Sequence, residues 1–222
     1  FPTDRELVEE YRASRHTIRE AVRRLQEEGL ITRRRGHGSY RTPALFAQPL
    51  GTIYSLFQSI EDAGVPQTSV VVTQAECRDD RAAKVLGLPV DSPLFYLERT
   101  RLAADQPLAL DEVWLPLPLA APLLEANLSR TALYAELRDR CGVVPEEGVE
   151  QSRAVTLDRA AAVRLGLNSG DPAFEIDRRT WARGRPLEWR VTIVRGDRYV
   201  FRAEWSTPWE PTSSRLVRES EE

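Results

Sequence analysis

Apolar side chains recur at helical spacing in two short runs within the first thirty residues. The second run places them three and four positions apart, at Ile18, Ala21, Val22 and Leu25. The first run follows Thr3-Asp4-Arg5-Glu6, the sequence of a capping box, in which the threonine hydroxyl accepts a backbone N–H and Glu6 reaches back. Ser14 is a natural N-cap for the second run. The pattern predicts two short helices joined by a turn at Arg12-Ala13.

The pattern then changes to that of a basic hairpin. Gly29 is expected to end the second helix, and residues 30–33 and 39–41 can pair across the segment 34–38. Residues 1–42 hold ten Arg against seven acidic residues, whereas the remaining chain holds 21 basic against 27 acidic residues. A basic segment joined to an acidic one is expected where only the first meets phosphates. A short Arg-bearing helix also fits a DNA major groove, with the hairpin beside it.

These residues resemble the winged helix-turn-helix of the GntR family of bacterial transcription regulators. The motifs that carry the resemblance are Pro2-Thr3-Asp4-Arg5-Glu6-Leu7, Ser14 to Val22, Gly29-Leu30-Ile31 and Arg35 to Gly38. Family members have a further helix before this point, so the domain is expected to lack its first helix. The resemblance implies a DNA-binding domain, and the residues expected to contact DNA are Arg5, Ser14, Arg15, His16, Thr17, Arg19, Arg35, Gly36, His37 and Gly38.

An alternative interpretation is that the arginines form a solvated helix face with nearby glutamates. We expect this for Arg23 and Arg24, and the full motif favours DNA contact for Arg15 and Arg19.

The longer part of the chain contains an internal duplication at a constant offset of 79 residues. Ala83-Lys84-Val85-Leu86-Gly87-Leu88 matches Ala162-Val163-Arg164-Leu165-Gly166-Leu167, and the correspondence continues without a gap to Leu108 and Leu187. Each copy predicts a helix capped at Asp80 or Asp158, a glycine stop, and two strands around a turn. With a helix over about 54–63, the strands expected are 69–77, 93–103, 107–115, 149–156, 172–182, 186–195 and 199–206. The fold class predicted is α+β, with an antiparallel sheet of pseudo-two-fold symmetry.

This part of the chain is similar to UTRA, the ligand-sensing domain of the HutC branch of the GntR family, which shares its fold with chorismate lyase. The motifs are Gly64-Val65-Pro66, Leu86-Gly87-Leu88, Glu98-Arg99-Thr100-Arg101, Pro107 to Pro116, Leu133-Tyr134, Pro186-Leu187-Glu188-Trp189 and Arg195 to Tyr199. The resemblance implies an effector-binding and dimerisation domain. The effector contacts expected are Ser55, Arg99, Arg101, Asp111, Tyr134 and Glu188.

Strand alternation supports part of this effector site. Arg99 and Arg101 are two residues apart, so they share a face, and guanidinium groups suit a carboxylate or phosphate. The alternative is that Arg99, Arg101, Arg178 and Asp111 form cross-strand ion pairs on an exposed face, each contributing little stability.

The expected domains are a DNA-binding domain at 1–42, a linker at 43–49, the effector domain at 50–206 and a mobile acidic tail at 207–222. We expect a cytoplasmic homodimeric repressor that binds a palindromic operator in double-stranded DNA, is associated with the nucleoid when bound, and is released by a small, anionic metabolite. It is expected to use no cofactor or metal and not to contact a membrane. Two isolated cysteines, Cys77 and Cys141, are typical of a reducing compartment.

No catalytic residues are expected, because both histidines, His16 and His37, fall in the DNA-binding part and leave the rest of the chain without a histidine base. The alternative function is a lyase-like enzyme that uses Asp111 and Glu188 as acid and base.

Overall fold

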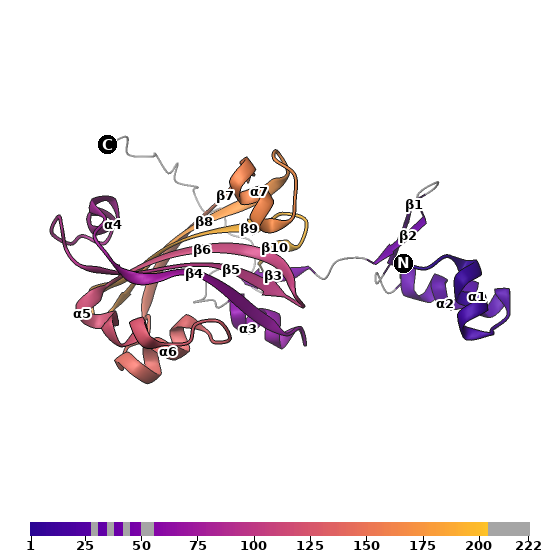
Figure 1. The fold of residues 1–222 in the computed structure, drawn as a ribbon, viewed down its shortest axis with the longest axis horizontal. Helices are drawn as coiled ribbons and strands as arrows, with labels where there is room; N and C mark the ends of the chain where they lie inside the picture. The colour runs from indigo at the N-terminus through magenta and orange to yellow at the C-terminus, as the bar shows by residue number, and fades with distance from the viewer. Residues whose placement is uncertain (28–30, 35–37, 42–44, 50–55, 204–222) are drawn as a thin grey trace, which may run out of the picture.

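The computed structural model describes residues 1–27, 31–34, 38–41, 45–49 and 56–203 (Figure 1). Its N-terminal unit comprises helices α1 (Asp4–Tyr11) and α2 (Arg15–Glu27) and the antiparallel hairpin of β1 (Ile31–Arg34) and β2 (Gly38–Arg41). Thr3 and Glu6 form the expected capping box, and the Ser14 hydroxyl accepts the Thr17 N–H at 3.1 Å to cap α2. The predicted helices and hairpin are confirmed. The Gly29 stop and the hairpin tip at Arg35, Gly36 and His37 lie outside the described residues.

A small apolar core holds this unit together. Its buried residues are Ile18 and Val22 on α2 and Ile31 on β1. Leu7, Val8, Ala13 and Leu25 pack around them, so both helices turn their apolar stripe towards one another.

The rest of the chain is built on a six-stranded antiparallel sheet with the order β4-β5-β6-β9-β8-β7. The strands are β4 (Gln67–Cys77), β5 (Leu94–Ala103), β6 (Gln106–Pro116), β7 (Glu147–Thr156), β8 (Pro172–Ala182) and β9 (Arg185–Arg195). The duplication predicts this arrangement, because β4–β6 and β7–β9 are equivalent and meet through β6 and β9. Glu112 faces Val191 across that contact. Since these two residues are themselves equivalent in the duplication, the pseudo-two-fold axis passes between them.

The duplicated helices are α4 (Asp80–Val85) and α7 (Arg159–Leu165). Asp158 caps α7 as expected, but the cap of α4 is Asp79, whose side chain accepts the Ala82 N–H at 2.9 Å. The prediction of Asp80 as the cap was therefore wrong by one residue. Asp79 and Asp158 are equivalent in the duplication, so the two copies keep the same helix start.

The sheet has two differently covered faces (Figure 1). Helix α4 covers Trp114 and Trp189, whose rings stack with centroids 4.4 Å apart, and α7 packs on the same face around Leu110. The opposite face carries α5 (Leu117–Ala120), the 3-10 helix η1 (Ala121–Glu125) and α6 (Leu133–Cys141) towards one end. Helix α3 (Leu56–Asp62) covers the other end of that face, within the predicted range 54–63.

Part of the expected linker belongs to the fold instead. Residues 46–49 form strand β3 (Phe46–Pro49), which pairs in parallel with β10 (Tyr199–Arg202). Phe46 and Gln48 are each only 2% exposed, and this burial fixes the segment in place. The linker prediction therefore fails for 46–49.

Strand β10, expected over 199–206, ends at Arg202 and pairs with β3 outside the six-stranded sheet. The expected tail at 207–222 lies outside the described residues, and the other domain boundaries remain predictions. Within the described parts of the chain, no helix is long and apolar enough to cross a membrane.

Candidate binding site

A cluster of buried charged and polar side chains lies on the α3–α6 face of the sheet, between its two apolar ends. Strand alternation brings them to one face from β5, β6, β8 and β9. Each is less than 10% exposed, and they are Arg99, Arg101, Asp111, Arg178, Thr180, Glu188, Arg190 and Thr192. Buried charges cost free energy unless they are paired, so the pairing determines what the site can bind.

Asp111 is the acceptor at the centre of the first group. Its Oδ2 accepts from Arg101 Nε at 2.6 Å and from Arg99 Nε at 3.1 Å, and its Oδ1 accepts from Thr192 Oγ1 at 2.8 Å. Burial alone would raise the pKa of Asp111, but the guanidinium groups of Arg101 and Arg99 outweigh burial and hold that pKa well below its usual range. The aspartate is therefore ionised at neutral pH.

Arg99 has more donor capacity than its partners use. It is fully buried, and burial, followed by the like charge of Arg101, lowers its pKa, although the group stays charged at neutral pH. Its Nη2 lies buried without a hydrogen-bond acceptor among the described residues. A buried guanidinium nitrogen in this state offers a hydrogen bond to an added acceptor.

A second group joins Tyr134 of α6 to β9. Its hydroxyl donates to Glu188 Oε2 at 2.5 Å, and Arg190 Nε donates to Glu188 Oε1 at 2.8 Å. The Arg190 guanidinium also lies 5.2 Å from the centroid of the Tyr134 ring. Burial and then the Glu188 carboxylate raise the pKa of Tyr134 to about 12, so its hydroxyl remains a donor at neutral pH.

A third group connects β8 to β3 and β10. Arg178 Nε donates to Glu150 Oε2 at 2.7 Å, and Glu150 Oε1 accepts from the Gln48 side-chain amide. The carbonyl oxygen of that amide accepts from the Tyr199 hydroxyl. Burial would lower the pKa of Arg178, but Tyr134 and the carboxylates of Glu150 and Glu188 outweigh it and raise that pKa.

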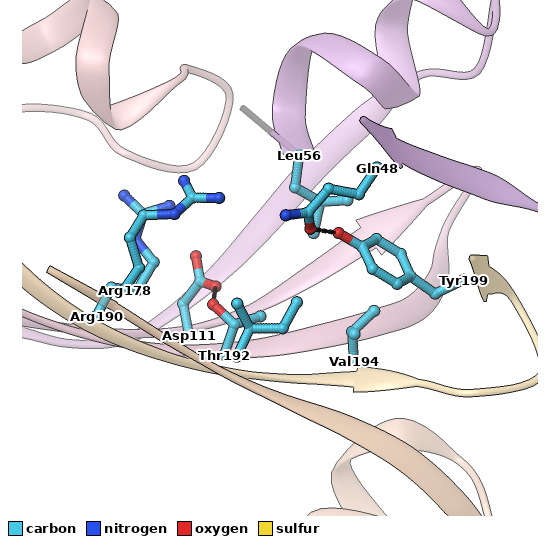
Figure 2. Close-up of a pocket in the computed structure, with 9 residues that line it drawn as sticks. Gln48, Leu56, Asp111, Arg178, Arg190, Thr192, Val194 and Tyr199 are labelled. Carbon is cyan, nitrogen blue, oxygen red and sulfur yellow. Dashed lines mark hydrogen bonds between the residues drawn. The ribbon is translucent and has the colours of Figure 1, made fainter. Parts of the chain in front are cut away.

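The first and third groups meet at a pocket (Figure 2). Figure 2 shows Asp111 and Thr192 on its floor, with Arg178 and Arg190 to one side and the Gln48–Tyr199 pair to the other. Leu56 and Val194 add apolar walls. About 20 Å³ is open to the centre of a water molecule, where one water needs roughly 10–15 Å³. A larger ligand must therefore displace side chains of the pocket.

The structure brings together the described members of the predicted effector set. Arg99, Arg101 and Asp111 form one ion-pair group, and Tyr134 and Glu188 form another. Ser55 lies outside the described residues. Arg99 and Asp111 are a direct cross-strand pair, as the alternative interpretation expected, but the pair is buried where that interpretation placed it on an exposed face.

The sequence analysis missed three residues that line the pocket, Arg190, Thr192 and Gln48, and it missed Glu150, which pairs with Arg178. It considered Arg178 as a member of possible cross-strand ion pairs. Two-residue alternation from Glu188 along β9 was a usable signal for Arg190 and Thr192. Gln48 gave no such signal, because it fell in the expected linker.

The residues expected to contact DNA are exposed wherever their side chains are described. These are Arg5, Ser14, Arg15, His16, Thr17 and Arg19. Arg5, Arg15 and Arg19 line one surface hollow of the N-terminal unit. Gly38 begins β2. Arg23, by contrast, pairs with Glu20 and Glu27 along α2, as expected for a solvated helix face.

The chain is similar to known proteins along nearly its whole length. Residues 62–200 match the family described as UTRA domain, and residues 1–40 match the family described as bacterial regulatory proteins, gntR family. The HTH-type transcriptional repressor NagR of Bacillus subtilis (strain 168) is 30% identical over 207 residues, which cover 90% of this chain and 83% of NagR. The HTH-type transcriptional repressor PhnF of Mycolicibacterium smegmatis is 29% identical over 205 residues, which cover 91% of this chain and 83% of PhnF.

Solved structures agree with these matches. The crystal structure of PhnF from Mycobacterium smegmatis aligns with a TM-score of 0.72 at 28% identity, over 94% of this chain and 92% of that one. The effector domain of PhnF, solved separately, aligns with a TM-score of 0.67 at 28% identity, over 72% of this chain and 99% of that one.

Proposed function

The chain belongs to the GntR family of bacterial transcription regulators and carries a UTRA domain, and on that premise we propose that it is a repressor released from DNA by a small anion. The observation that carries the proposal is the pocket, because Arg178 and Arg190 line it next to a buried cluster that contains two further guanidinium groups. Guanidinium groups bind carboxylates and phosphates through paired, charge-assisted hydrogen bonds. NagR and PhnF are both named as repressors, which supports repression rather than activation of the target genes.

On the DNA side, we propose that Arg15 and Arg19 read base edges from the exposed start of α2. Ser14 and Thr17 would position the helix through phosphate oxygens. One such unit offers few base contacts, so two copies of the chain on the half-sites of a palindromic operator would supply affinity. The protein would then act as a homodimer on the nucleoid in the bacterial cytoplasm.

On the effector side, release requires that the anion bind the DNA-incompetent arrangement more tightly than the competent one. The small size of the pocket supports such a difference, because a bound anion must rearrange the ion pairs around Asp111 or Arg178. The unused donor of Arg99 would bind an added acceptor in the same cluster.

The lyase-like alternative has weak support from the geometry. An acid–base pair needs one carboxyl group able to give a proton near neutral pH. The guanidinium groups beside Asp111 hold its pKa well below its usual range, and Glu188 accepts from Arg190 and Tyr134 at once. Both carboxylates are thus occupied as acceptors.

Binding to the promoter fragment upstream of the chain's own gene tests the proposal. Arg15→Ala should weaken binding by roughly 1–3 kcal/mol and relax the sequence preference. Arg23→Ala is the matched control, because that arginine is already paired with Glu20 and Glu27, and it should bind like the wild type. Equal gel shifts for both variants would reject the base-reading role of Arg15. If the wild type fails to bind any fragment of the locus, the proposed function itself is wrong.

A further inference from the structure

We propose that Gln48 links occupancy of the pocket to the DNA-binding unit. The inference rests on the proposed function, because it describes how that same site would control DNA binding. It is carried by the position of Gln48, which lines the pocket and also belongs to the first strand that follows the DNA-binding unit along the chain.

Strand β3 is a short anchor between two parts of the molecule. Among the described strands, β10 is the one with which its four residues pair, and its Phe46 N–H donates to Arg198 O at 2.9 Å. Phe46 is buried, and the Arg198 guanidinium lies 5.5 Å from the centroid of its ring. Strand β3 follows α2, β1 and β2 along the chain, so a shift of β3 moves the end of the segment that joins it to the DNA-binding unit.

The Gln48 amide ties this anchor to the charged cluster. Its nitrogen donates to Glu150 Oε1 on β7, and its oxygen accepts from the Tyr199 hydroxyl on β10. The other oxygen of Glu150 accepts from Arg178, at 2.7 Å from Nε. Pocket, Arg178, Glu150 and Gln48 thus form one continuous chain of charge-assisted and neutral hydrogen bonds.

Competition for Arg178 makes this series of hydrogen bonds responsive to a ligand. An anion that enters the pocket presents oxygen acceptors to the same guanidinium that now holds Glu150. When Arg178 turns to the anion, Glu150 loses this cationic partner and keeps its hydrogen bond to the Gln48 amide. A carboxylate in a partly buried place is then driven towards water, and Gln48 moves with it or loses its hydrogen bond.

This position distinguishes Gln48 from a purely structural buried amide. A buried glutamine that only completes a core can exchange its partners locally, as Gln67 does with Thr68 and Ser69 of its own strand. Gln48 instead bonds to residues 102 and 151 positions away, on two different strands. Gln48 is therefore a positioning residue that acts through Glu150 and β3.

A double-mutant cycle tests the link without an identified ligand. Arg178→Gln removes the partner that an anion would take from Glu150, and Gln48→Leu removes the amide at nearly constant volume. In the full-length protein, hydrogen–deuterium exchange is followed in peptides that cover residues 46–49, and affinity is measured for the promoter fragment. Arg178→Gln should speed exchange at Phe46 to Gln48 several-fold and change DNA affinity. In the Gln48→Leu background it should change neither, which corresponds to a coupling on the order of 2- to 100-fold.

Two further variants keep the test decisive. Glu150→Gln removes the carboxylate charge that would be driven towards water and keeps a hydrogen-bonding group, so in this background Arg178→Gln should change neither exchange at residues 46–48 nor DNA affinity. Gln67→Leu, the same change in a buried glutamine outside the pocket, should leave the response to Arg178→Gln intact.

Equal effects of Arg178→Gln with and without Gln48→Leu, in both exchange and affinity, would overturn the inference. If the wild type binds no fragment of its locus, the proposed function fails, and the exchange data still decide whether Gln48 couples Arg178 to β3.

Discussion

Asp111→Asn is expected to destabilise the domain built on the six-stranded sheet strongly, because it removes a carboxylate that two buried arginines share. Arg99 and Arg101 are 0% and 2% exposed, and both donate to the same oxygen of Asp111. The substitution keeps the shape of the side chain and removes its charge. Two buried guanidinium groups then lose the carboxylate that both of them contact.

The expected loss follows from the cost of a broken buried ion pair. Removing one partner of such a pair costs about 3–5 kcal/mol, mostly because the remaining charge stays buried and uncompensated. For a chain of 222 residues each kcal/mol lowers the melting temperature by roughly 2–4 °C. Asp111→Asn should therefore lower it by roughly 6–20 °C.

The pH dependence has a defined sign. The pKa of Asp111 is lowered in the folded state, so its contribution is present above the unfolded-state pKa of about 3.9 and is lost as the pH falls towards the folded-state value. The difference in unfolding free energy between the wild type and Asp111→Asn should be constant between about pH 5 and pH 8. It should narrow below about pH 4.

Urea unfolding followed by tryptophan fluorescence is a suitable assay, because Trp114, Trp181 and Trp189 lie on strands of the six-stranded sheet and residues 1–42 contain no tryptophan. Asp105→Asn is the matched control, since that exposed turn residue has a φ of 62° that asparagine adopts readily, and it should change stability by less than about 0.5 kcal/mol. A loss below about 1 kcal/mol for Asp111→Asn, or a difference that widens in acid, would refute the buried ion-pair reasoning.

Three other predictions concern packing and capping. Trp114→Ala should cost about 3–5 kcal/mol in urea unfolding, because it removes a large buried ring stacked on Trp189; an unchanged midpoint would contradict the stacked core under α4. Gly196→Ala should lower the free energy of unfolding by about 1–3 kcal/mol, because a Cβ there would lie 2.9 Å from the backbone oxygen of Pro172. An unchanged urea midpoint would show that the backbone after β9 can shift to accommodate the methyl group. Thr3→Ala should reduce the stability of α1 by about 1 kcal/mol, seen as faster amide exchange in its first turn, and equal exchange would argue against the capping box.

The duplication made most of the sheet predictable from the sequence. A strand predicted in one copy predicts the equivalent strand of the other copy 79 positions away, and the sheet joins the two copies through β6 and β9. Alternation along β5 also placed Arg99 and Arg101 on one face, whereas Asp111 entered the expected site through the family resemblance and lies opposite Arg99 in the structure.

What the sequence could not supply was contact between distant, unpatterned segments. Strand β3 has only four residues, the last of which is Pro49, and among the described residues it pairs with a strand that begins at Tyr199. The partners of Gln48 are equally remote. Helix α4 shows a smaller error of the same kind, because adjacent aspartates at 79 and 80 both satisfy the rule for a cap and only the backbone geometry selects Asp79.

One further consequence follows from the pseudo-two-fold axis between β6 and β9. Arg99 faces Asp111 in the first copy, whereas the equivalent positions of the second copy hold Arg178 facing Arg190. The two copies present equivalent strands, but the opposite charges at positions 111 and 190 make this face of the sheet asymmetric in charge. A molecule with two unlike ends therefore meets two different neighbours across the axis, and we expect it to lie in one direction only.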